Sequence, residues 1–360
     1  MNKPSLHLVV MAGGSGTRFW PKSTSQRPKQ LLSFGKDTSE TLLVHTLKRF
    51  DGLVPPGVEH RTIVTTRQLK HAVGEQAPDV AVLAEPAGRN TAPCVYWAAR
   101  AIFEKDPRAV MLVMPSDHYI ADLASFKRSV MQAAEWASSH DDLVTLGVKP
   151  SRPETGYGYL RLGAPVAGSA GPATHGDCRK VEAFVEKPKF DKAREFVESG
   201  NYLWNGGMFL WRAEVILKAF AEFMPEMDQV WNRSDGKVEV AYPQMTATSI
   251  DYGVMEKAKN VVTFTLDCGW DDLGSWTSLE SLSEVLEARH ECGVLTGGQV
   301  ISVDSTGNIV DAPGKLIALL GVENLIVVQH GNAILVARKD RAQDIKLIVE
   351  QVKKKRPELA

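Results

Sequence analysis

Hydrophobic and polar residues follow two alternating patterns along the first 270 positions. Short uninterrupted apolar runs, typical of strands buried on both faces of a sheet, occur at 8–11, 61–65, 80–83, 110–114, 143–146 and 261–266. Helical periodicity separates several of these runs, at 41–50, 92–103 and 125–138. The alternation predicts an α/β fold with a Rossmann-like mixed, mostly parallel sheet flanked by helices. In such folds ligands bind at the carboxyl ends of the strands.

The pattern changes twice further along the chain. Extended segments at 159–162, 180–186 and 208–211 and a helix at 191–199 suggest an insertion or second half that closes over a ligand site. A helix is predicted at 275–288, and after it glycines and short Val- and Ile-rich runs predict a small β-rich domain. The last predicted helix carries an apolar stripe that needs the β segment or a second subunit as its partner: Ile345, Ile348, Val349 and Val352. We expect domains at 1–288 and 289–360.

Composition excludes several classes of protein. The 360 residues are 44% hydrophobic and 24% charged with a formal net charge of −1, which is ordinary for a soluble globular protein and gives no case for nucleic-acid binding. The basic cluster at 353–356 is expected to be a solvated helix end. Four cysteines far apart suggest neither a zinc site nor a disulfide framework. Without a signal peptide or a run of membrane length, the sequence predicts a cytoplasmic protein with no membrane partner.

A glycine-rich turn follows the first predicted strand. Its residues are Ala12, Gly13, Gly14, Ser15, Gly16 and Thr17, and the cations Arg18, Lys22 and Lys29 come shortly after. Small residues let backbone N–H groups approach an anion, and the cations add fixed positive charge. Phe19 stands where a dinucleotide fingerprint has its third glycine, and no Gly-Lys-Ser/Thr follows. A plain tight connection is the alternative; the favoured interpretation is a cradle for a nucleoside triphosphate.

Carboxylates occur at two further strand ends. Ser116 and Asp117 follow the strand at 110–114, and Asp271 and Asp272 follow the strand at 261–266. One carboxylate from each segment would suit Mg²⁺, which keeps several waters and binds phosphate oxygens. A structural cap is the alternative for Asp117, and His118 is expected to be a hydrogen-bonded wall residue.

Three other polar segments have both a functional and a structural interpretation. Glu85, Asn90 and Thr91 precede a helix and could contact a base, or Asn90 or Thr91 could cap that helix. Glu186 and Lys187 suit sugar hydroxyls and a phosphate, or form an exposed ion pair of little energetic weight. Asn205, beside two glycines, could bind a ligand or lie in a plain turn.

The order of these segments resembles the sugar-nucleotide pyrophosphorylases, within them the branch that makes GDP-mannose. The resemblance covers about residues 5 to 280 and rests on motifs in family order: GGSGTR with the later PK pair, EPAGRNTAP, PSDH, GYGY, FVEKP, WNGGMF, SIDYGVMEK and GWDDLGSW. It implies an enzyme that joins GTP and mannose 1-phosphate into GDP-mannose and pyrophosphate, with Mg²⁺. Because the nucleophile is an ionised phosphate oxygen, such an enzyme needs no general base; it needs charge neutralisation.

The resemblance also implies roles for individual residues. Arg18 and Lys29 match cations at the triphosphate, and Asp117 and Asp272 match metal ligands. The phosphates would be wrapped by residues 12–17 with Ser116 nearby, and the guanine would lie near Glu85, Asn90 and Thr91. The positions expected around the sugar phosphate are Tyr157, Gly158, Glu186, Lys187, Asn205 and, more weakly matched, Asp251. Lys22 receives no role and is expected to be solvated.

Several alternatives stay open at this point. Phe19, Gly206 and Asp271 depart from the usual family residues, and Asp271 leaves the choice between the two neighbouring acids undecided. Another sugar 1-phosphate or nucleotide is one alternative function, and a silent GDP-mannose-binding regulator is another. Isomerase activity is not expected. For residues 290–360 the resemblance implies a small left-handed β-helix that serves a homodimer.

Overall fold

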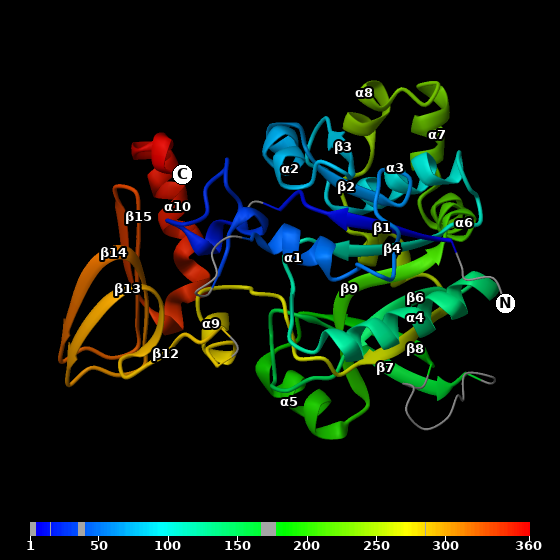
Figure 1. Cartoon of the computed structure of the whole chain (residues 1–360). Coiled ribbons are helices and arrows are strands. Elements are labelled where there is room, and N and C mark those ends of the chain that lie inside the picture. Colours follow the sequence, from blue (N-terminus) through cyan, green and yellow to red (C-terminus); the bar gives the residue numbers. More distant parts are fainter. Residues whose placement is uncertain (1–4, 15, 35–39, 167–177, 285) are drawn as a thin grey trace. The chain divides into compact units, whose positions relative to one another are not determined.

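The computed structural model of the chain describes residues 5–14, 16–34, 40–166, 178–284 and 286–360, and these form two compact units (Figure 1). The first unit is drawn from residues 1–13, 49–115 and 122–270, and the second from 14–48, 116–121 and 271–360. Each unit therefore contains segments that are far apart in the sequence. The predicted division into two continuous domains, 1–288 and 289–360, stays a prediction.

The first unit is built on a nine-stranded sheet in the order β3-β2-β1-β4-β9-β6-β10-β8-β7. Its strands are β1 (Leu6–Met11), β2 (Arg61–Thr66), β3 (Ala81–Glu85), β4 (Val110–Pro115), β6 (Leu143–Val148), β7 (Gly158–Pro165), β8 (Arg179–Glu186), β9 (Tyr202–Arg212) and β10 (Val261–Leu266). Strand pairing makes β8 and β9 run opposite to the other strands. The predicted mixed, mostly parallel sheet is confirmed.

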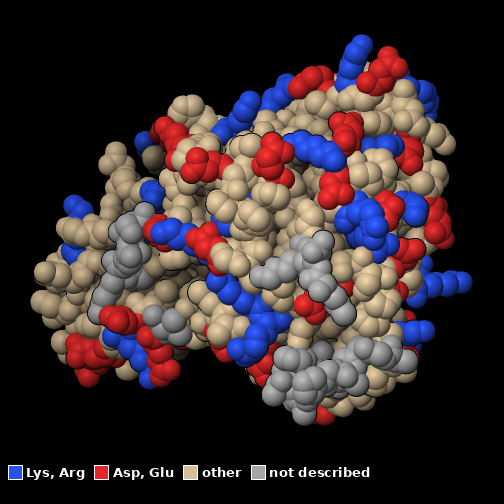
Figure 2. Space-filling view, turned by 45° about the vertical axis from the view of Figure 1, so that its right-hand side comes forward, with Lys and Arg blue, Asp and Glu red and all other residues tan. Residues whose placement is uncertain are grey.

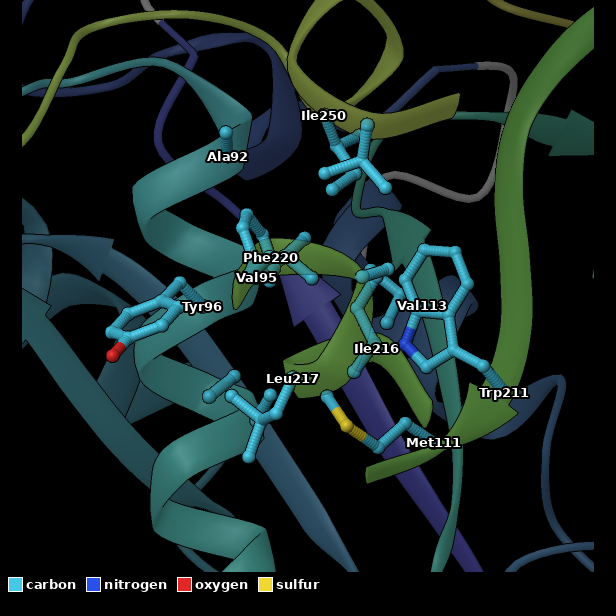
Figure 3. Close-up of a cluster of buried hydrophobic side chains, with 14 of the residues drawn as sticks. Ala92, Val95, Tyr96, Met111, Val113, Trp211, Ile216, Leu217, Phe220 and Ile250 are labelled. Carbon is cyan, nitrogen blue, oxygen red and sulfur yellow. The ribbon is translucent and has the colours of Figure 1, made fainter. Parts of the chain in front are cut away.

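Helices cover both faces of this sheet. They are α2 (Lys70–Gln76), α3 (Thr91–Phe103), α4 (Leu123–Ser139), α5 (Phe190–Ser199), α6 (Ala213–Phe223), α7 (Pro225–Arg233) and α8 (Val238–Ala241). Figure 3 shows side chains of α3 and α6, Val95 and Ile216 among them, in one buried cluster with the strand residues Val113 and Trp211. Alternate residues of β1 and β4 face this cluster, while α4 packs against β4, β6, β9 and β10. Burial on both faces explains the uninterrupted apolar runs.

The second unit contains a five-stranded sheet in the order β12-β13-β14-β15-β16. Its elements are α1 (Leu42–Lys48), α9 (Ser278–Ser281), β12 (Arg289–His290), β13 (Gly293–Val303), β14 (Asn308–Leu320), β15 (Leu325–His330), β16 (Ala333–Arg338) and α10 (Ile345–Lys355). Strands β13, β14 and β15 are parallel although few residues connect them. This is possible because β13 bends within its length, with register shifts on either side of Gly297. The predicted β-rich C-terminal segment is confirmed. Two short strands, β5 (Tyr119–Ile120) and β11 (Trp270–Asp271), form a separate ladder.

Two predictions for the end of the chain have different outcomes. The helix predicted at 275–288 is wrong over most of its length, since only α9 is helical there among the described residues. Serines explain this: the hydroxyls of Ser281 and Ser283 bond to the carbonyls of Ser278 and Glu280, in competition with a regular helix. For most of the apolar stripe of α10 the partner is the β segment, because Ile345 and Val349 lie in one core with residues of β14, β15 and β16 and Val352 packs against it. Ile348 is an exception, since it is exposed.

The surface agrees with the balanced composition. Over most of the face shown in Figure 2, basic and acidic side chains are interspersed. Among the helices of the described residues, none has both the length and the apolar character needed to cross a membrane.

Candidate active site

The start of the glycine turn and the end of β3 lie in the first unit. The carbonyl of Ala12 accepts a hydrogen bond from the Thr65 hydroxyl (2.9 Å), which fixes the chain as it leaves β1. Gly13 follows, and a Cβ atom there would lie 3.0 Å from Oε2 of Glu85. The turn and the Glu85 carboxyl group are therefore neighbours, and a side chain at position 13 would crowd them.

The rest of the turn lies in the second unit, together with the arm that follows it, which we define as residues 16–31. Arg18 and Thr17 lie in the 3₁₀ turn η1 (Thr17–Phe19), and Lys29 begins the 3₁₀ turn η2 (Lys29–Leu31). Gly16 has a φ of 54°, and a Cβ atom there would lie 2.5 Å from the backbone nitrogen of Lys29. The turn and η2 thus touch through glycine. Ser15 lies outside the described residues.

Lys29 lies between the two predicted metal-binding segments. Its ammonium is 2.8 Å from Oδ2 of Asp117 and 2.5 Å from the backbone carbonyl of Asp272, and its side chain is buried. Burial alone would raise the pKa of Asp117, but the charges of Lys29 and His118 and the hydrogen bond from Lys29 hold that pKa below its usual value. The carboxyl group of Asp117 is therefore kept ionised. Lys29, Asp117 and the Asp272 segment form one cluster.

The two neighbouring acids differ in their surroundings. Asp271 is buried, and its carboxylate accepts hydrogen bonds from the backbone N–H of Leu273 (2.8 Å) and from the Ser281 hydroxyl (3.4 Å). Asp272 is only partly buried. Asp271 thus has hydrogen-bond partners in its own loop, and the choice of Asp272 as a metal ligand stays a prediction. Ser116 is buried as well, and its carbonyl accepts a hydrogen bond from Thr46.

The other two cations of the arm contact the C-terminal part of the second unit. Arg18 is exposed and donates to Oε1 of Gln343 (2.8 Å). The expectation that Lys22 is solvated is wrong: its ammonium is 2.5 Å from Oδ2 of Asp311, and its side chain is 12% exposed. The physical reason is that Asp311, on β14, is completely buried and requires a compensating charge.

The residues expected near the base lie together in the first unit. Glu85 is buried and accepts a hydrogen bond from the hydroxyl of Tyr242. Burial raises the pKa of Glu85, and the Tyr242 hydrogen bond opposes this shift. Asn90 caps α3, with its side-chain oxygen accepting from the N–H of Thr91 (2.8 Å), so the capping alternative is observed. The Thr91 hydroxyl accepts from the N–H of Ile250.

The residues expected near the sugar phosphate form a second group in the first unit. Gly158 pairs with Glu186 across β7 and β8, and a Cβ atom at Gly158 would lie 2.5 Å from Oε2 of Glu186. Lys187 forms an ion pair with Glu186 (2.5 Å), and its backbone N–H donates to the carbonyl of Tyr157. The ion-pair alternative for these two residues is therefore also observed.

Asn205 and Asp251 complete this group. Asn205 lies in β9, so the alternative of a plain turn is wrong; strand pairing with β6 and β7 holds the segment extended. Its amide donates to Oδ1 of Asp251 (2.7 Å). Burial raises the pKa of Asp251, more than the Asn205 hydrogen bond lowers it, and the charge of Glu186 adds to the increase. Tyr157 packs edge-on against Trp204 and Trp270.

Two contacts to the expected site were not found by sequence reasoning. Tyr242 holds Glu85 from 157 positions away, and Asp311 holds Lys22 from 289 positions away. Neither Tyr242 nor Asp311 stands in a motif, and no local pattern indicates such a distant partner.

Known proteins place the chain in a family. Residues 7–289 match the family described as nucleotidyl transferase, and residues 298–352 match the one described as MannoseP isomerase/GMP-like beta-helix domain. The Pseudomonas aeruginosa alginate biosynthesis protein AlgA is 37% identical over 96% of this chain and 71% of that protein. An Escherichia coli mannose-1-phosphate guanylyltransferase is 36% identical over 98% and 74%.

A solved structure supports the same assignment. A Thermus thermophilus protein described as a mannose-1-phosphate geranyltransferase superposes with a TM-score of 0.85 at 34% identity, over 97% of this chain and 99% of that one. These matches confirm the resemblance drawn from the motifs and make the chain an enzyme. It belongs to the nucleotidyl transferase family, with a β-helix domain of the MannoseP isomerase/GMP-like type.

Proposed function

We propose that the enzyme transfers a guanylyl group from GTP to mannose 1-phosphate, releasing pyrophosphate and GDP-mannose. A phosphate oxygen of the sugar phosphate forms a bond to the α-phosphorus of GTP, and the bond from that phosphorus to the bridging oxygen of pyrophosphate breaks. The observation that carries the proposal is the cluster of Lys29 with Asp117 and the Asp272 segment, next to a glycine turn. Two polyanions must meet, and such a cluster suits phosphate and metal together.

The residues present fit Mg²⁺. Within the described ranges no group of three or more His, Cys, Asp and Glu could hold a metal by itself. Mg²⁺ does not need one, since it is bound by one or two carboxylates and completes its coordination with water and phosphate oxygens. Asp117 and Asp272 would hold it, and both offer the hard oxygen ligands that it prefers. When bound, Mg²⁺ would offset the charge that develops on the phosphates.

The chain's own residues have separate tasks in this proposal. Lys29, buried and fixed by two partners, presents a cation without first having to be ordered. Arg18, exposed and bonded to a neutral amide, exchanges that partner for a phosphate at small cost. The backbone of residues 12–17 follows the phosphates, with Ser116 nearby.

Base and sugar are assigned to the two groups of the first unit. Glu85 in its ionised form accepts the two neighbouring N–H donors of guanine, with Asn90 and Thr91 beside it. Glu186, Asn205 and Asp251 suit sugar hydroxyls, and Lys187 suits the sugar phosphate; Gly158 leaves room for the Glu186 carboxylate and Tyr157 forms an apolar wall. The names of the relatives support GTP and mannose 1-phosphate as the pair.

We also propose a homodimer in which the second unit provides the contact. Strands β13 and β14 carry exposed apolar residues on one face, because Val303 pairs with Leu320 and Ile301 with Ala318 in parallel register. Side chains at paired positions of a sheet point to the same side. Such a face is suited to burial against a second copy.

Pyrophosphate release tests the reaction. Purified enzyme with Mg²⁺ is offered four nucleoside triphosphates against several sugar 1-phosphates, and GTP with mannose 1-phosphate should give the highest kcat/KM. A different preferred pair would move the proposal to another substrate while keeping the chemistry. Binding of GDP-mannose without any pyrophosphate release would favour the regulator instead.

Two substitutions test the cluster. Lys29→Ala and Asp117→Ala should each lower kcat by at least about 100-fold, since each removes charge aimed at the reacting phosphates. Circular dichroism and the unfolding temperature establish whether the variants are folded. A folded variant with a normal rate would remove that residue from the mechanism.

A further inference from the structure

The arm that carries Arg18 and Lys29 packs within the second unit against the C-terminal residues. Phe19 and Trp20 belong to one buried core with Trp276 and with residues of β14, β15 and α10. The indole N–H of Trp20 donates to the carbonyl of Leu359 (2.8 Å). The C-terminal region is thus the packing partner of the arm.

A buried ion pair lies at the centre of this contact. Lys22 stands between Arg18 and Lys29 in the sequence, and its ammonium is 2.5 Å from Oδ2 of Asp311, whose side chain has no exposed area. Oδ1 of Asp311 is buried too, and no hydrogen bond to it is found among the described residues. The Lys22 ammonium also lies 5.9 Å from the centre of the Phe34 ring. The carboxylate therefore depends on Lys22 for its compensation.

Contacts lead from Lys22 to the proposed phosphate-binding residues. The hydroxyl of Ser23, the next residue, donates to the carbonyl of Gly16 (2.7 Å), and Ser23 is buried. Gly16 in turn lies against the backbone of Lys29. A displacement of Lys22 would therefore be passed to Gly16 and Lys29 through contacts within the arm.

We propose that Lys22 and Asp311 are positioning residues, through which the C-terminal β segment sets the placement of the arm at the triphosphate. A buried ion pair contributes little net stability compared with apolar residues. It nevertheless favours the one arrangement in which the two groups meet, because either charge is costly to bury without the other. Here that geometry is the position of residue 22 against β14. The inference rests on the proposed role of the arm in binding GTP.

Steady-state kinetics test the proposal with Lys22→Met, Lys22→Arg and the control Lys339→Met. Lys339 forms an ion pair of similar length in the same unit, with Glu280 at 2.6 Å, but Glu280 is 41% exposed and Lys339 lies outside the arm. Lys22→Met should raise the KM for GTP about tenfold and the KM for mannose 1-phosphate less than twofold. Lys22→Arg keeps the charge, so its KM for GTP should stay within about threefold of the wild-type value. Lys339→Met should leave both KM values within about twofold.

The double variant Lys22→Met with Asp311→Asn removes the uncompensated charge and so guards against simple misfolding. Its KM for GTP should stay raised, because the link between the arm and β14 is gone. A wild-type KM for GTP in the folded double variant would overturn the proposal, since Lys22 would then serve only to compensate the charge of Asp311. Equal increases of the KM for GTP in Lys22→Met and Lys339→Met would also overturn it.

Hydrogen exchange provides a readout that does not depend on catalysis. Backbone N–H groups within the arm, those of Phe19, Trp20 and Ser23 among them, are hydrogen-bonded. Peptides covering residues 16–31 should exchange faster in Lys22→Met than in wild type, and Lys339→Met should leave them unchanged; unchanged exchange in Lys22→Met would contradict the proposal. Lys29→Ala distinguishes failure of the proposed function from failure of this inference. A normal rate in Lys29→Ala would contradict the role of the arm in the reaction. An inactive Lys29→Ala together with a normal Lys22→Met would contradict only the positioning role of Lys22 and Asp311.

Discussion

Glu85 shows how a single buried contact can adjust a binding group. Its carboxyl group lies at the end of β3, beside Gly13, with the Tyr242 hydroxyl as hydrogen-bond donor. Burial favours the protonated acid, whereas the Tyr242 hydrogen bond favours the ionised form. Guanine offers two neighbouring N–H donors, so only the ionised form of Glu85 can accept both. Tyr242 therefore supports the form that the proposed recognition needs.

Tyr242→Phe should weaken GTP binding in a pH-dependent way. Loss of the hydroxyl donor raises the pKa of Glu85 further. As the pH is lowered, Glu85 should therefore become protonated, and the affinity for GTP should fall, at a higher pH in the variant than in wild type. At pH 7 we expect the KM for GTP to rise about tenfold, the equivalent of one hydrogen bond to a charged group. KM profiles between pH 5.5 and 8 provide the measurement.

Tyr96→Phe is the matched control for this experiment. The hydroxyl of Tyr96 also donates a hydrogen bond to an acid in the same unit, Asp228 (2.5 Å). Its ring packs against Phe220 and Trp231, away from the glycine turn. Its effect should be limited to stability. Identical pH profiles for wild type and Tyr242→Phe would refute the role given to Tyr242.

His7 links the stability of the first unit to pH. Burial, with the charges of His60 and Lys105, lowers the pKa of this histidine on β1 to about 4, and its ring bonds to the Thr62 hydroxyl (2.9 Å). Between its ordinary pKa of 6.5 and about 4, the unfolded chain binds a proton that the folded chain does not. Stability should therefore fall as the pH drops through this window, by about 1.4 kcal/mol per pH unit.

The variant His7→Gln isolates this effect. Urea unfolding of wild type and variant at pH 7.5, 6.0 and 5.0 gives the difference in unfolding free energy at each pH, in which the titration of other groups cancels. The difference should shift in favour of the variant as the pH falls. A constant difference would mean that His7 is not responsible.

At the level of elements, the glycine turn offers a comparison between two neighbouring positions. Gly16 has a positive φ and a Cβ atom there would lie 2.5 Å from atoms of Lys29, whereas a Cβ atom at Gly14 would meet nothing within 4 Å. Gly16→Ala should destabilise the protein by at least about 1 kcal/mol and lower kcat through Lys29.

Gly14→Ala should keep the stability of the wild type. If the turn follows the triphosphate, its added methyl group should nevertheless raise the KM for GTP, because it obstructs the approach of phosphate to the backbone. Thermal unfolding and steady-state kinetics on both variants check these expectations. A Gly14→Ala enzyme with wild-type kinetics would place the triphosphate elsewhere.

Elements were more predictable than the contacts between them. The strands β1, β4 and β10 follow from apolar runs, because a strand buried on both faces leaves that mark in the sequence. The predicted helix at 275–288 failed where serine hydroxyls bond locally, which apolar periodicity does not reveal. The sequence alone predicts a solvated Lys22, because its partner Asp311 stands in a strand far along the chain. The cluster around Lys29 could be anticipated only from motifs, since its geometry depends on folding.

At the level of the whole molecule, the division into two units does not follow the order of the sequence. The chain passes from one unit to the other at Gly13 to Gly14, at Pro115 to Ser116 and at Trp270 to Asp271. Each of these passages lies within two residues of a predicted site residue: the glycine turn, Asp117 and Asp272. The proposed metal residues and the part of the turn after Gly13 thus fold with the C-terminal segment. Ala12, Gly13 and the proposed base and sugar residues fold with the large sheet. The β segment shares a buried core with Phe19 and Trp20 of the arm, so we expect its removal to disturb the arm as well.

The exposed face of β13 and β14 makes the oligomeric state testable. Leu320 is 75% exposed and Ile301 is 58% exposed, on strands paired in register. If a second copy covers this face, Leu320→Glu should produce monomers, because burying an unpaired carboxylate in an apolar interface is costly. Position 320 is already exposed within one chain, so the substitution should change the unfolding temperature of a single chain only slightly.

Light scattering coupled to size-exclusion chromatography, at several micromolar protein, should give a dimer for wild type and a monomer for Leu320→Glu. Lys315→Glu, at an exposed position of the same strand that already carries a charge, is the control and should remain dimeric. A monomeric wild type, or a dimer that withstands Leu320→Glu together with Ile301→Glu, would show that this face is not the contact.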